Sequence, residues 1–581
     1  MMDKNTLLAV VLSVIVITIG FSVQSTLFPP EQTQPQQEQT DVAPAVSAED
    51  ESAPETAVTG VQRVANVKRA ESASTINEET VVLETNIFIA TFSNRGGVLT
   101  SMKLKEHEDG GKPLEMVNKR ESNEAAFNLH FGGPDREAID DLFRVVRLDG
   151  STVRFEGEFT YRDDNGNDVP FTLQKTYTFK PDDYLFELDI TIINSINDIP
   201  RLENDGFAYT LTFGPQIGPE FSSLGGRQEY RRFYQYDGSK RHTVKIDKNT
   251  QYSTTNERYV WSAIAGKYFT VIAVPGAASF STTYSSRPIP GLEDTAKMHF
   301  SRPVIKSSRN TDTFRFYFGP KTARILNKYN DTEKNSFNVQ ALDFDEVIDQ
   351  GRILGWLENI LKFILVTFYK VIPNYGVAII LLTIFIKIVL FPFTHKSYES
   401  TSKMQSFAPK INELKEKYKD NPNKMNAEMA AMYKREGINP MGGCLPILFQ
   451  MPIFIALYGL LNKHFDLRGA VFIEGWITDL SSPETIFTLP FTIPILGWSE
   501  IHLLPFLFVG TQLWSSKQMS AGSMASNSQM KMMTYLMPVM FFFILYDMPS
   551  GLLLYWTVTN VLTTIQQLFI TRHQKTHPKG A

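Results

Sequence analysis

The chain has little cysteine and no clustered metal ligands. Its single cysteine, Cys444, excludes a disulfide within the chain and any cysteine-cluster metal site. The nine histidines are scattered, without an HExxH motif or another ligand spacing, so the sequence does not predict a metal enzyme. An exported domain in this chain would have to be stabilised by its core alone.

Long apolar runs are missing from residues 30–350 and frequent in residues 353–571. The net charge of -5 therefore averages a polar part and a membrane part. The run 375–393, YGVAIILLTIFIKIVLFPF, is long enough to span a bilayer, yet it contains Lys387. A charge in the middle of a span costs roughly 2.5 to 3.5 kcal/mol on insertion scales, so this lysine needs an explanation.

The amino-terminal residues 1–28 contain an apolar run at 7–28, preceded by Lys4. The run is longer than the apolar core of a signal peptide, about 7 to 15 residues, so it predicts a transmembrane anchor; a cleaved signal is the alternative. Residues 29–60 are rich in Pro, Gln, Glu and Ala and predict a disordered linker, because they have few large apolar side chains to bury.

Residues 61–340 are predicted to form a β-sandwich domain. In residues 184–192 apolar and polar side chains mostly alternate, and LQKTYTF at 173–179 precedes them across a short turn, so the two segments predict a hairpin. Similar segments recur at 86–92, 152–161, 269–275 and 313–319. The histidines of this region, His107, His130, His242 and His299, are predicted to stand alone rather than form a site.

Two amphipathic regions flank the 375–393 run. Residues 352–372 predict a helix in the membrane interface. Residues 394–440 are rich in lysine and predict a hairpin of two helices closed by Gly437, with a solvated loop as the alternative. The apolar side chains of this hairpin are predicted to lie on one face of each helix: Ile411, Leu414 and Tyr418 on the first, Met425 and Met429 on the second.

Four further segments complete six predicted spans: 443–462, 501–515, 533–548 and 550–570. The connections are a loop at 464–500, a loop at 516–532 and a basic tail at 571–581, and the Pro-rich stretch 487–498 is too short to cross. The loop 464–500 is acidic, whereas 394–440, 516–532 and the tail are basic. The positive-inside rule therefore places both termini in the cytoplasm and the β-domain outside.

Polar side chains lie inside several of these spans. Thr383 and Lys387 share a helix face, and Gln450 and Gln512 lie at depth. A polar stripe is predicted on the last span, formed by Thr557, Asn560, Thr564 and Gln567. Two explanations remain open: these groups join helices while Lys387 extends toward the cytoplasmic surface, or they line a wet cavity around Lys387.

The segments NPMGGCLPILFQMPIFIALYGLL (439–461), MPSGLLLYWTVTNVLTTIQQ (548–567) and AAMYKREGINP (430–440) resemble the YidC/Oxa/Albino family of membrane protein insertases. The resemblance covers residues 352–570 in motif and the whole chain in layout. It implies a multi-pass α-helical membrane protein of six spans, five of them forming an insertase core, with a large periplasmic all-β sandwich domain of the Gram-negative type.

The same resemblance implies an insertase and chaperone of the bacterial inner membrane that is not an enzyme and uses no cofactor. Lys387 matches the family's positive groove residue, which is usually arginine, and Thr383 and Trp556 match positions that contact the passing segment. The implied partners are nascent membrane proteins, the Sec translocon and membrane lipids, with the ribosome and signal recognition machinery as further candidates and no direct contact with nucleic acid.

Two other functions stay open on the residues alone. A secondary transporter or channel could use Lys387, although the spans contain no inverted repeat and no acidic partner. A membrane-anchored saccharide-binding protein is the second alternative, because a β-sandwich of this size could hold a saccharide.

Overall fold

The computed structural model describes residues 67–576. Its gaps are 71–75, 110, 120–123, 163–165, 195–201, 215–216, 221–223, 225–228, 248, 287–294, 350–353, 420, 438–444, 494–497 and 521–527. The predicted anchor at 1–28, the linker at 29–60, Cys444 and the end of the basic tail lie outside the described residues.

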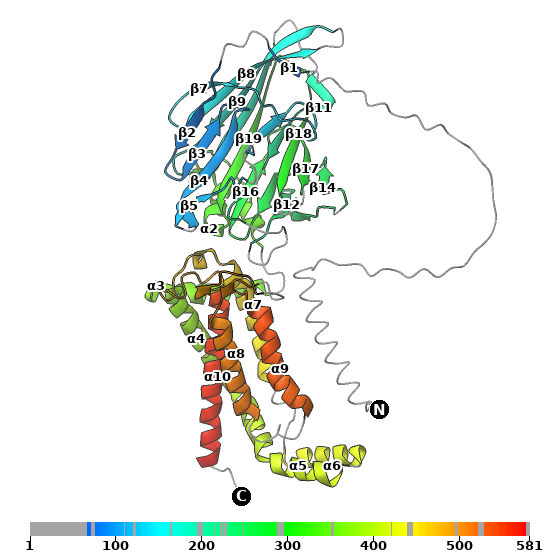
Figure 1. Ribbon diagram of the computed structural model, residues 1–581, viewed down its shortest axis with the longest axis vertical. Helices are drawn as coiled ribbons and strands as arrows, with labels where there is room; N and C mark the ends of the chain where they lie inside the picture. The colour runs from blue at the N-terminus through cyan, green and yellow to red at the C-terminus, as the bar shows by residue number, and fades with distance from the viewer. Residues whose placement is uncertain are drawn as a thin grey trace, which may run out of the picture. The chain divides into compact units, whose positions relative to one another are not determined.

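The largest sheet of the described residues has ten antiparallel strands, in the order β1-β8-β9-β10-β19-β16-β15-β12-β13, with β7 paired to β8. Figure 1 shows its long strands β8 and β9 side by side, with β19 in the same sheet beyond β10. The strands are β1 (Val67–Arg69), β7 (Arg144–Arg147), β8 (Thr152–Arg162), β9 (Asp168–Thr178), β10 (Leu185–Asn194), β12 (Arg232–Tyr236), β13 (Arg241–Val244), β15 (Trp261–Ala265), β16 (Phe269–Val274) and β19 (Arg309–Pro320).

Two smaller sheets complete the β-domain. The five-stranded sheet has the order β14-β17-β18-β11-β6 and the four-stranded sheet the order β2-β3-β4-β5. Their strands are β6 (Asn128–His130), β11 (Leu202–Phe213), β14 (Tyr252–Thr255), β17 (Ser281–Ser285) and β18 (Lys297–Ile305) in the first, and β2 (Thr80–Glu84), β3 (Phe88–Ser93), β4 (Val98–Asp109) and β5 (Lys112–Glu115) in the second.

Alternating apolar side chains build the core between these sheets. In β10, Leu188, Ile190 and Ile192 are fully buried, as the period-two pattern of 184–192 predicts. Phe127 contacts Phe316 across 4.6 Å between ring centroids and extends the core into an aromatic cluster. The predicted hairpin is confirmed, because β9 and β10 pair antiparallel.

Short helical segments follow β19 and lead to the helical part of the chain. They are α2 (Ala323–Leu326) and the 3₁₀ turns η1 (Asn327–Asn330), η2 (Thr332–Lys334) and η3 (Phe344–Val347). Tyr329 and Phe344 are fully buried against Tyr317 of β19, so these segments belong to the β-domain core.

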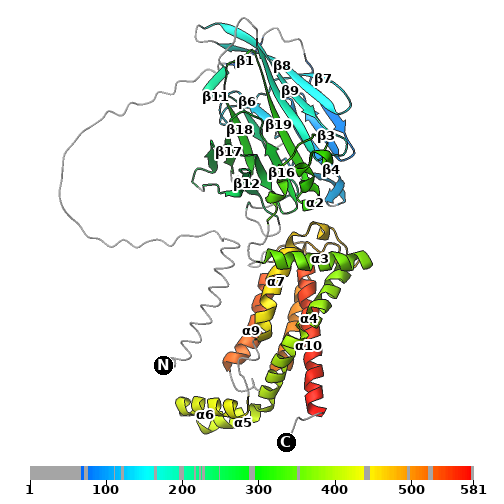
Figure 2. The same ribbon diagram turned by 180° about the vertical axis from the view of Figure 1, so that it is seen from behind.

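The helical part consists of helices that pack around a second, separate apolar core. The helices are α3 (Gly355–Val371), α4 (Tyr375–Ser406), α5 (Ala408–Lys417), α6 (Pro422–Arg435), α7 (Leu445–Lys463), α8 (Leu504–Ser520), α9 (Ser528–Leu545) and α10 (Ser550–Thr576). α10 packs against α4 and α8, and α9 packs against α8. α3 packs across α4 and α7, as Figures 1 and 2 both show.

α4 differs from the predicted element by its length. It continues through Pro392 to Ser406, past the predicted end at residue 393. Pro392 removes one backbone donor but leaves the rest of the hydrogen-bond ladder intact, so a polar helix can continue an apolar one. The predicted helical hairpin is present as α5 and α6, which pack together, and Gly437 adopts a φ of 61° just after α6.

The segment between α7 and α8 is largely irregular. It contains the 3₁₀ turn η5 (Phe465–Leu467) and a two-stranded ribbon of β20 (Phe487–Thr488) and β21 (Glu500–Ile501). In the described residues of 487–498 there is no helix, which agrees with the prediction that this stretch does not cross a membrane.

Within the described residues, one helical stretch is long and apolar enough to cross a membrane by length and composition, Tyr375–Pro392 of α4. Leu536–Leu545 of α9 is a shorter apolar stretch. The predicted six spans are therefore not confirmed by this criterion. Two physical reasons are visible: α8 has only 17 residues, and polar side chains lower the apolar character of α10, which is long enough at 27 residues.

Candidate functional site

Lys387 lies on α4 and extends toward α10. Its Nζ atom donates a 2.7 Å hydrogen bond to Oγ1 of Thr563. The side chain is partly buried, because α10 packs along α4 at this level. The charge at the centre of the apolar stretch therefore has a hydroxyl partner.

No ion pair involving Lys387 occurs among the residues that the structure describes. A hydroxyl contributes a partial charge only, whereas a carboxylate would compensate a full one. The ammonium group thus keeps hydrogen-bonding capacity, since it carries three donors and uses one of them here.

Thr383 lies one helical turn before Lys387. Its side chain is almost completely buried, and its hydroxyl donates to the carbonyl oxygen of Ile379 at 2.7 Å. About two turns before Thr383, a Cβ atom on Gly376 would meet the Phe472 ring at 2.1 Å, so glycine is required for the close approach of the 464–500 segment. This face of α4 is packed at one end and polar at the other.

The polar side chains of α10 that reach α4 are not those of the predicted stripe. Thr563 bonds Lys387, and the Gln566 amide donates to Oγ1 of Thr394 at 3.2 Å. At 100° per residue, Thr563 lies about a quarter turn away from the predicted stripe. The groove lining by the stripe stays a prediction. The sequence did not indicate that Thr563 is the residue that contacts Lys387, because periodicity alone does not give the rotation of a helix against its neighbours.

The predicted stripe itself faces other parts of the bundle. Asn560 donates to Thr511 of α8 at 3.5 Å, and Thr564, fully buried, donates to the carbonyl oxygen of Asn560 at 2.9 Å. Thr557 Oγ1 and Gln567 Oε1 are buried atoms without a hydrogen-bond partner among the described residues. These two oxygens can accept a hydrogen bond from another molecule or water.

Trp556 occupies an aromatic box at the start of α10. Its ring stacks on Phe454 of α7 at a centroid distance of 4.5 Å and an angle of 4°, and lies 5.4 Å from Phe508 of α8. Gln450 of α7 lies beside the hydroxyl of Tyr555, the preceding residue. Gln512 on α8 is partly buried.

The α5–α6 hairpin presents both apolar and basic groups. Ile411 of α5 and Met432 of α6 are buried between the helices. The remaining predicted apolar residues, Leu414, Tyr418, Met425 and Met429, are only partly buried. Lys417 and Lys424 both lie 5.5 Å from the Tyr418 ring, so positive charge borders this apolar strip.

A buried carboxylate that the sequence analysis did not single out fixes the opposite end of the bundle. Glu484 accepts hydrogen bonds from the backbone N–H of Leu504, 2.5 Å away at the start of α8, and from Trp476 Nε1, 3.1 Å away. Its side chain is almost completely buried. Glu484 lies 20 residues before Leu504, so its position gives little signal for such a cap, and Glu474 and Glu500 are equally acidic candidates in the sequence.

Thr563, Thr511 and Thr394 are the other contacts that sequence reasoning missed. Each is a threonine inside a helix whose hydroxyl donates to a carbonyl oxygen of its own helix, so nothing in the sequence marks that the same hydroxyl also accepts from another helix. In the described residues, no group of three or more His, Cys, Asp or Glu side chains could hold a metal ion.

Two family models match the chain. The model described as 60Kd inner membrane protein matches residues 367–577, and the YidC periplasmic domain model matches residues 80–366. These descriptions place the chain at the inner membrane, with the β-domain on the periplasmic side. Neither model names an enzyme.

Relatives match the chain over almost its whole length. The membrane protein insertase YidC of Treponema denticola is 38% identical over 99% of this chain and 100% of that protein. The membrane protein insertase YidC of Treponema pallidum is 34% identical over 98% of this chain and 99% of that protein.

Solved structures resemble the chain more distantly. A crystal structure of an active YidC insertase with its first transmembrane domain resolved is 17% identical and covers 86% of this chain and 93% of that chain, with a TM-score of 0.35. A galactose mutarotase-like protein from Lactobacillus casei is 11% identical over 42% of this chain and 100% of that chain, with a TM-score of 0.31. These TM-scores support neither a shared site nor a shared activity. From the family models and the full-length relatives, the chain belongs to the YidC family of membrane protein insertases.

Proposed function

We propose that the chain inserts nascent membrane proteins into the inner membrane and that Lys387 draws the polar outer segment of each client partway into the bilayer. The observation that carries the proposal is the position of Lys387: a partly buried ammonium group on α4 whose hydrogen-bond partner, among the described residues, is the hydroxyl of Thr563. An incoming carboxylate can supply the counter-charge that the described residues around Lys387 do not.

The energetics favour a transient acidic partner over a permanent one. Two unit charges 4 Å apart attract by about 4 kcal/mol at an effective dielectric constant of 20, typical of a partly wet protein site. A fixed acid would occupy the lysine permanently, whereas a client carboxylate gains this attraction only while it passes. Lysine presents a point charge without the planar fork of arginine, so the interaction depends on charge more than on geometry.

Exposed apolar side chains offer the client's apolar segment a route into lipid. On α4, Ile388 is 66% exposed one residue after Lys387, and on α10, Phe569 is 78% exposed six residues after Thr563. A segment held by its polar end at Lys387 would lie beside these side chains. Thr383, Trp556, Gln450, Gln512 and the α10 stripe Thr557, Asn560, Thr564 and Gln567 are proposed to border the same passage.

The layout of the chain completes the proposal. Six spans with cytoplasmic termini place the α5–α6 hairpin in the cytoplasm, where its strip of Ile411, Leu414, Tyr418, Met425 and Met429 receives clients. α3 lies in the outer interface of the membrane, since Phe363 is 73% exposed while Leu365 is fully buried. The Sec translocon, the ribosome and the signal recognition machinery are proposed partners of this arrangement.

The test is insertion into liposomes that contain the purified protein. The client is a single-span protein whose outer segment carries either one Asp or one Asn. With the Asp client we expect wild type and Lys387→Arg to insert alike, and Lys387→Ala to insert about tenfold less, a change of about 1.4 kcal/mol. With the Asn client the three proteins should differ little, because the client then carries no charge to attract.

Two further variants separate the effect of the Lys387 charge from the effect of removing any lysine or of removing its hydrogen-bond partner. Lys370→Ala removes an exposed lysine of α3 and should insert like wild type. Thr563→Val removes the partner of Lys387 and keeps the charge, so insertion should persist. Equal insertion of the Asp client by Lys387→Ala and wild type would refute the role of Lys387, and no insertion by wild type would refute the insertase proposal and favour a transporter.

A further inference from the structure

The β-domain contains a large cleft on one face of its five-stranded sheet. The cleft has a volume of about 1080 Å³ and is lined by β14, β17 and β18 on one side and by residues between 119 and 140 on the other. Small-molecule clefts usually measure about 300 to 1,000 Å³, so this one can hold a ligand of more than one ring.

Strand alternation makes the sheet side of this cleft polar. The register pairs Ser281 with Ser301, Thr283 with His299 and Ser285 with Lys297, which places all six side chains on one face. The intervening residues Tyr284, Met298 and Phe300 face the other way and are fully buried in the core. One sequence pattern therefore forms both a core face and a hydroxyl-rich face.

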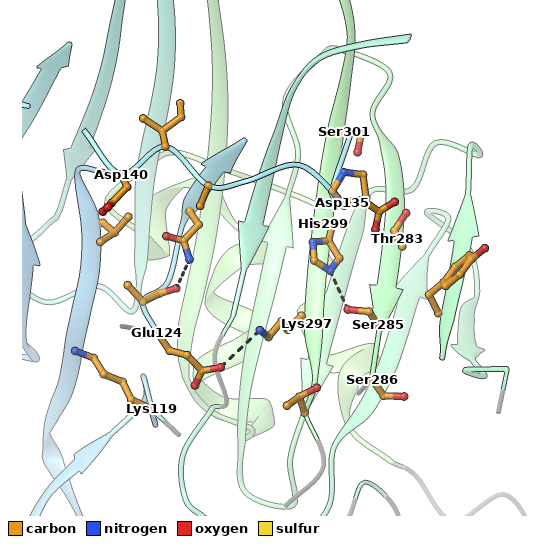
Figure 3. Close-up of a pocket in the computed structure, with 18 of the residues that line it drawn as sticks. Lys119, Glu124, Asp135, Asp140, Thr283, Ser285, Ser286, Lys297, His299 and Ser301 are labelled. Carbon is orange, nitrogen blue, oxygen red and sulfur yellow. Dashed lines mark hydrogen bonds and ion pairs between the residues drawn. The ribbon is translucent and has the colours of Figure 1, made fainter. Parts of the chain in front are cut away.

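The hydroxyl groups of this face are organised by hydrogen bonds to one another. Thr254 bonds Thr283 at 2.9 Å, and His299 bonds Ser285 at 2.8 Å and Thr212 at 3.0 Å. Figure 3 shows the His299–Ser285 contact at the wall of the cleft. Each hydroxyl has one donor and two acceptor sites, so these groups retain acceptor capacity for a ligand.

The charges around the cleft nearly balance. The basic lining residues are Arg95, Lys119 and Lys297, and the acidic ones are Glu78, Glu124, Asp135 and Asp140. Three contacts pair them: Arg95 with Glu78 at 3.0 Å and with Asp140 at 3.7 Å, and, across the cleft, Lys297 with Glu124 at 3.6 Å (Figure 3 labels Lys297 and Glu124). A phosphate or another strong anion would lie near four carboxylates, so this lining favours an uncharged ligand with many hydrogen-bonding groups.

Aromatic side chains add an apolar surface to this polar lining. Tyr252 lines the cleft and is 52% exposed, and Phe207 lines it from β11. A sugar ring has an apolar C–H face and a polar rim of hydroxyls, so it can stack on an aromatic ring while its hydroxyls bond to Ser, Thr, Asn and carboxylate groups.

We propose that this cleft binds an uncharged saccharide of two or three rings. His299 acts in it as a neutral donor and acceptor, because burial lowers its pKa to about 3. Both ring nitrogens of His299 contact hydroxyl groups, and no described carboxylate contacts them.

An extended polypeptide is the competing occupant. Among the described residues β14 ends the five-stranded sheet and offers an edge to which a peptide strand could add. The sheet wall of the cleft favours the saccharide, since it presents mainly short hydroxyl side chains, which the hydroxyls of a sugar can pair with. The apolar lining residues, among them Val98, Ile139 and Phe207, can contact the C–H face of a sugar ring.

The test is calorimetric titration of the full-length protein in detergent with cellobiose, maltotriose and triacetylchitotriose. We expect at least one of the three to bind. Tyr252→Ala should weaken this binding about tenfold, and Thr254→Trp, which fills the cleft from an exposed wall position, should abolish it. Tyr259→Ala is the matched control, because Tyr259 bonds Glu257 outside the cleft and should bind like wild type.

If the near-ultraviolet circular dichroism spectrum of a variant matches that of wild type, the variant is folded, and its loss of binding is not caused by unfolding. The proposal is overturned if none of the three saccharides binds at up to about 10 mM, or if Tyr252→Ala and Thr254→Trp bind like wild type. Equally tight binding of glycerol or tighter binding of inorganic phosphate would also overturn it. The proposal would also be overturned if a polar peptide bound to wild type but not to Thr254→Trp, while the saccharides bound to neither protein. The cleft would then be a peptide site.

Discussion

At the scale of single residues, two lysines in apolar surroundings differ in the hydrogen-bond partners of their ammonium groups. Lys387 has one hydroxyl partner, whereas Lys175, fully buried in the β-domain, donates to the carbonyl oxygens of Gly96 at 2.9 Å and Phe127 at 2.7 Å. Gly96 and Phe127 have φ values of 70° and 68°, in the left-handed region of backbone conformation. At Gly96 a Cβ atom would lie 2.7 Å from the carbonyl oxygen of Ile139, which requires glycine.

Burial lowers the pKa of Lys175 from 10.5 to about 7, and this shift makes a testable prediction. Between these two values the unfolded chain binds a proton more readily than the folded one, so stability falls as the pH falls. Lys175→Met removes the titrating group. The unfolding free energy of wild type should therefore rise relative to that of Lys175→Met by roughly 1.4 kcal/mol per pH unit from about pH 7 to about pH 10.

Pulse proteolysis in urea, with the β-domain fragments followed on gels, measures this difference on the full chain. Lys103→Met is the matched control, because Lys103 is exposed on β4 and its replacement should leave the pH dependence unchanged. Parallel pH profiles for wild type and Lys175→Met would show that the Lys175 amine stays protonated in the folded protein.

At the scale of elements, helices of the bundle are positioned by side chains from the segments between them. Glu484 caps α8 through the Leu504 N–H and also accepts from Trp476, and the carbonyl oxygen of Glu484 lies 2.5 Å from His502 Nδ1. The hydroxyl of Ser550, the first residue of α10, donates to the carbonyl oxygens of Asp479 and Ser482. The starts of α8 and α10 are thereby held by one segment.

Glu484→Gln tests this anchoring. The amide nitrogen of glutamine cannot accept a hydrogen bond, so one of the two donors loses its partner. We expect a local destabilisation of about 1 to 3 kcal/mol, seen as faster hydrogen exchange of the amides at 504–508.

The exposed residue Glu474 lies in the same segment and provides the control. Glu474→Gln makes the same change of charge without removing a buried acceptor, so exchange at 504–508 should match that of wild type. If the two variants behaved alike, the Glu484 carboxylate would not be the group that holds the start of α8.

At the scale of the whole molecule, the β-domain and the helical part have separate hydrophobic cores. Lys387 and its described contacts all lie in the helical part. We therefore predict that deletion of most of residues 60–330 leaves insertion of the Asp client within about twofold of wild type, measured in the same liposome assay.

The same deletion should abolish saccharide binding, because the cleft lies wholly within the deleted region. The two assays then report on two independent parts of one chain. Loss of insertion in a deletion variant that still runs as a single species on gel filtration would contradict the separation of the two parts.

The strands and helices could be predicted from the sequence wherever one physical signal dominated. Alternation over 184–192 predicted β10, and the 375–393 run predicted the apolar part of α4. The continuation of α4 to Ser406 was missed because a proline followed by polar residues also marks a helix end. The polar cleft was missed because its hydroxyls come from alternate positions of three short strands, β14, β17 and β18, none of which carries a motif.

The sequence by itself determined the division of the chain into a polar β-domain and an apolar helical part, and the presence of Lys387 within an apolar helix. Both follow from local hydropathy and periodicity, which depend on neighbours along the chain. Tertiary structure alone decided the partner of each buried polar group: Thr563 for Lys387, two backbone carbonyls for Lys175, and Leu504 and Trp476 for Glu484. Those partners depend on how helices rotate and how loops fold back. Lys387 and Thr563, for example, are 176 positions apart in the sequence, so a pattern of neighbouring residues could not contain their contact.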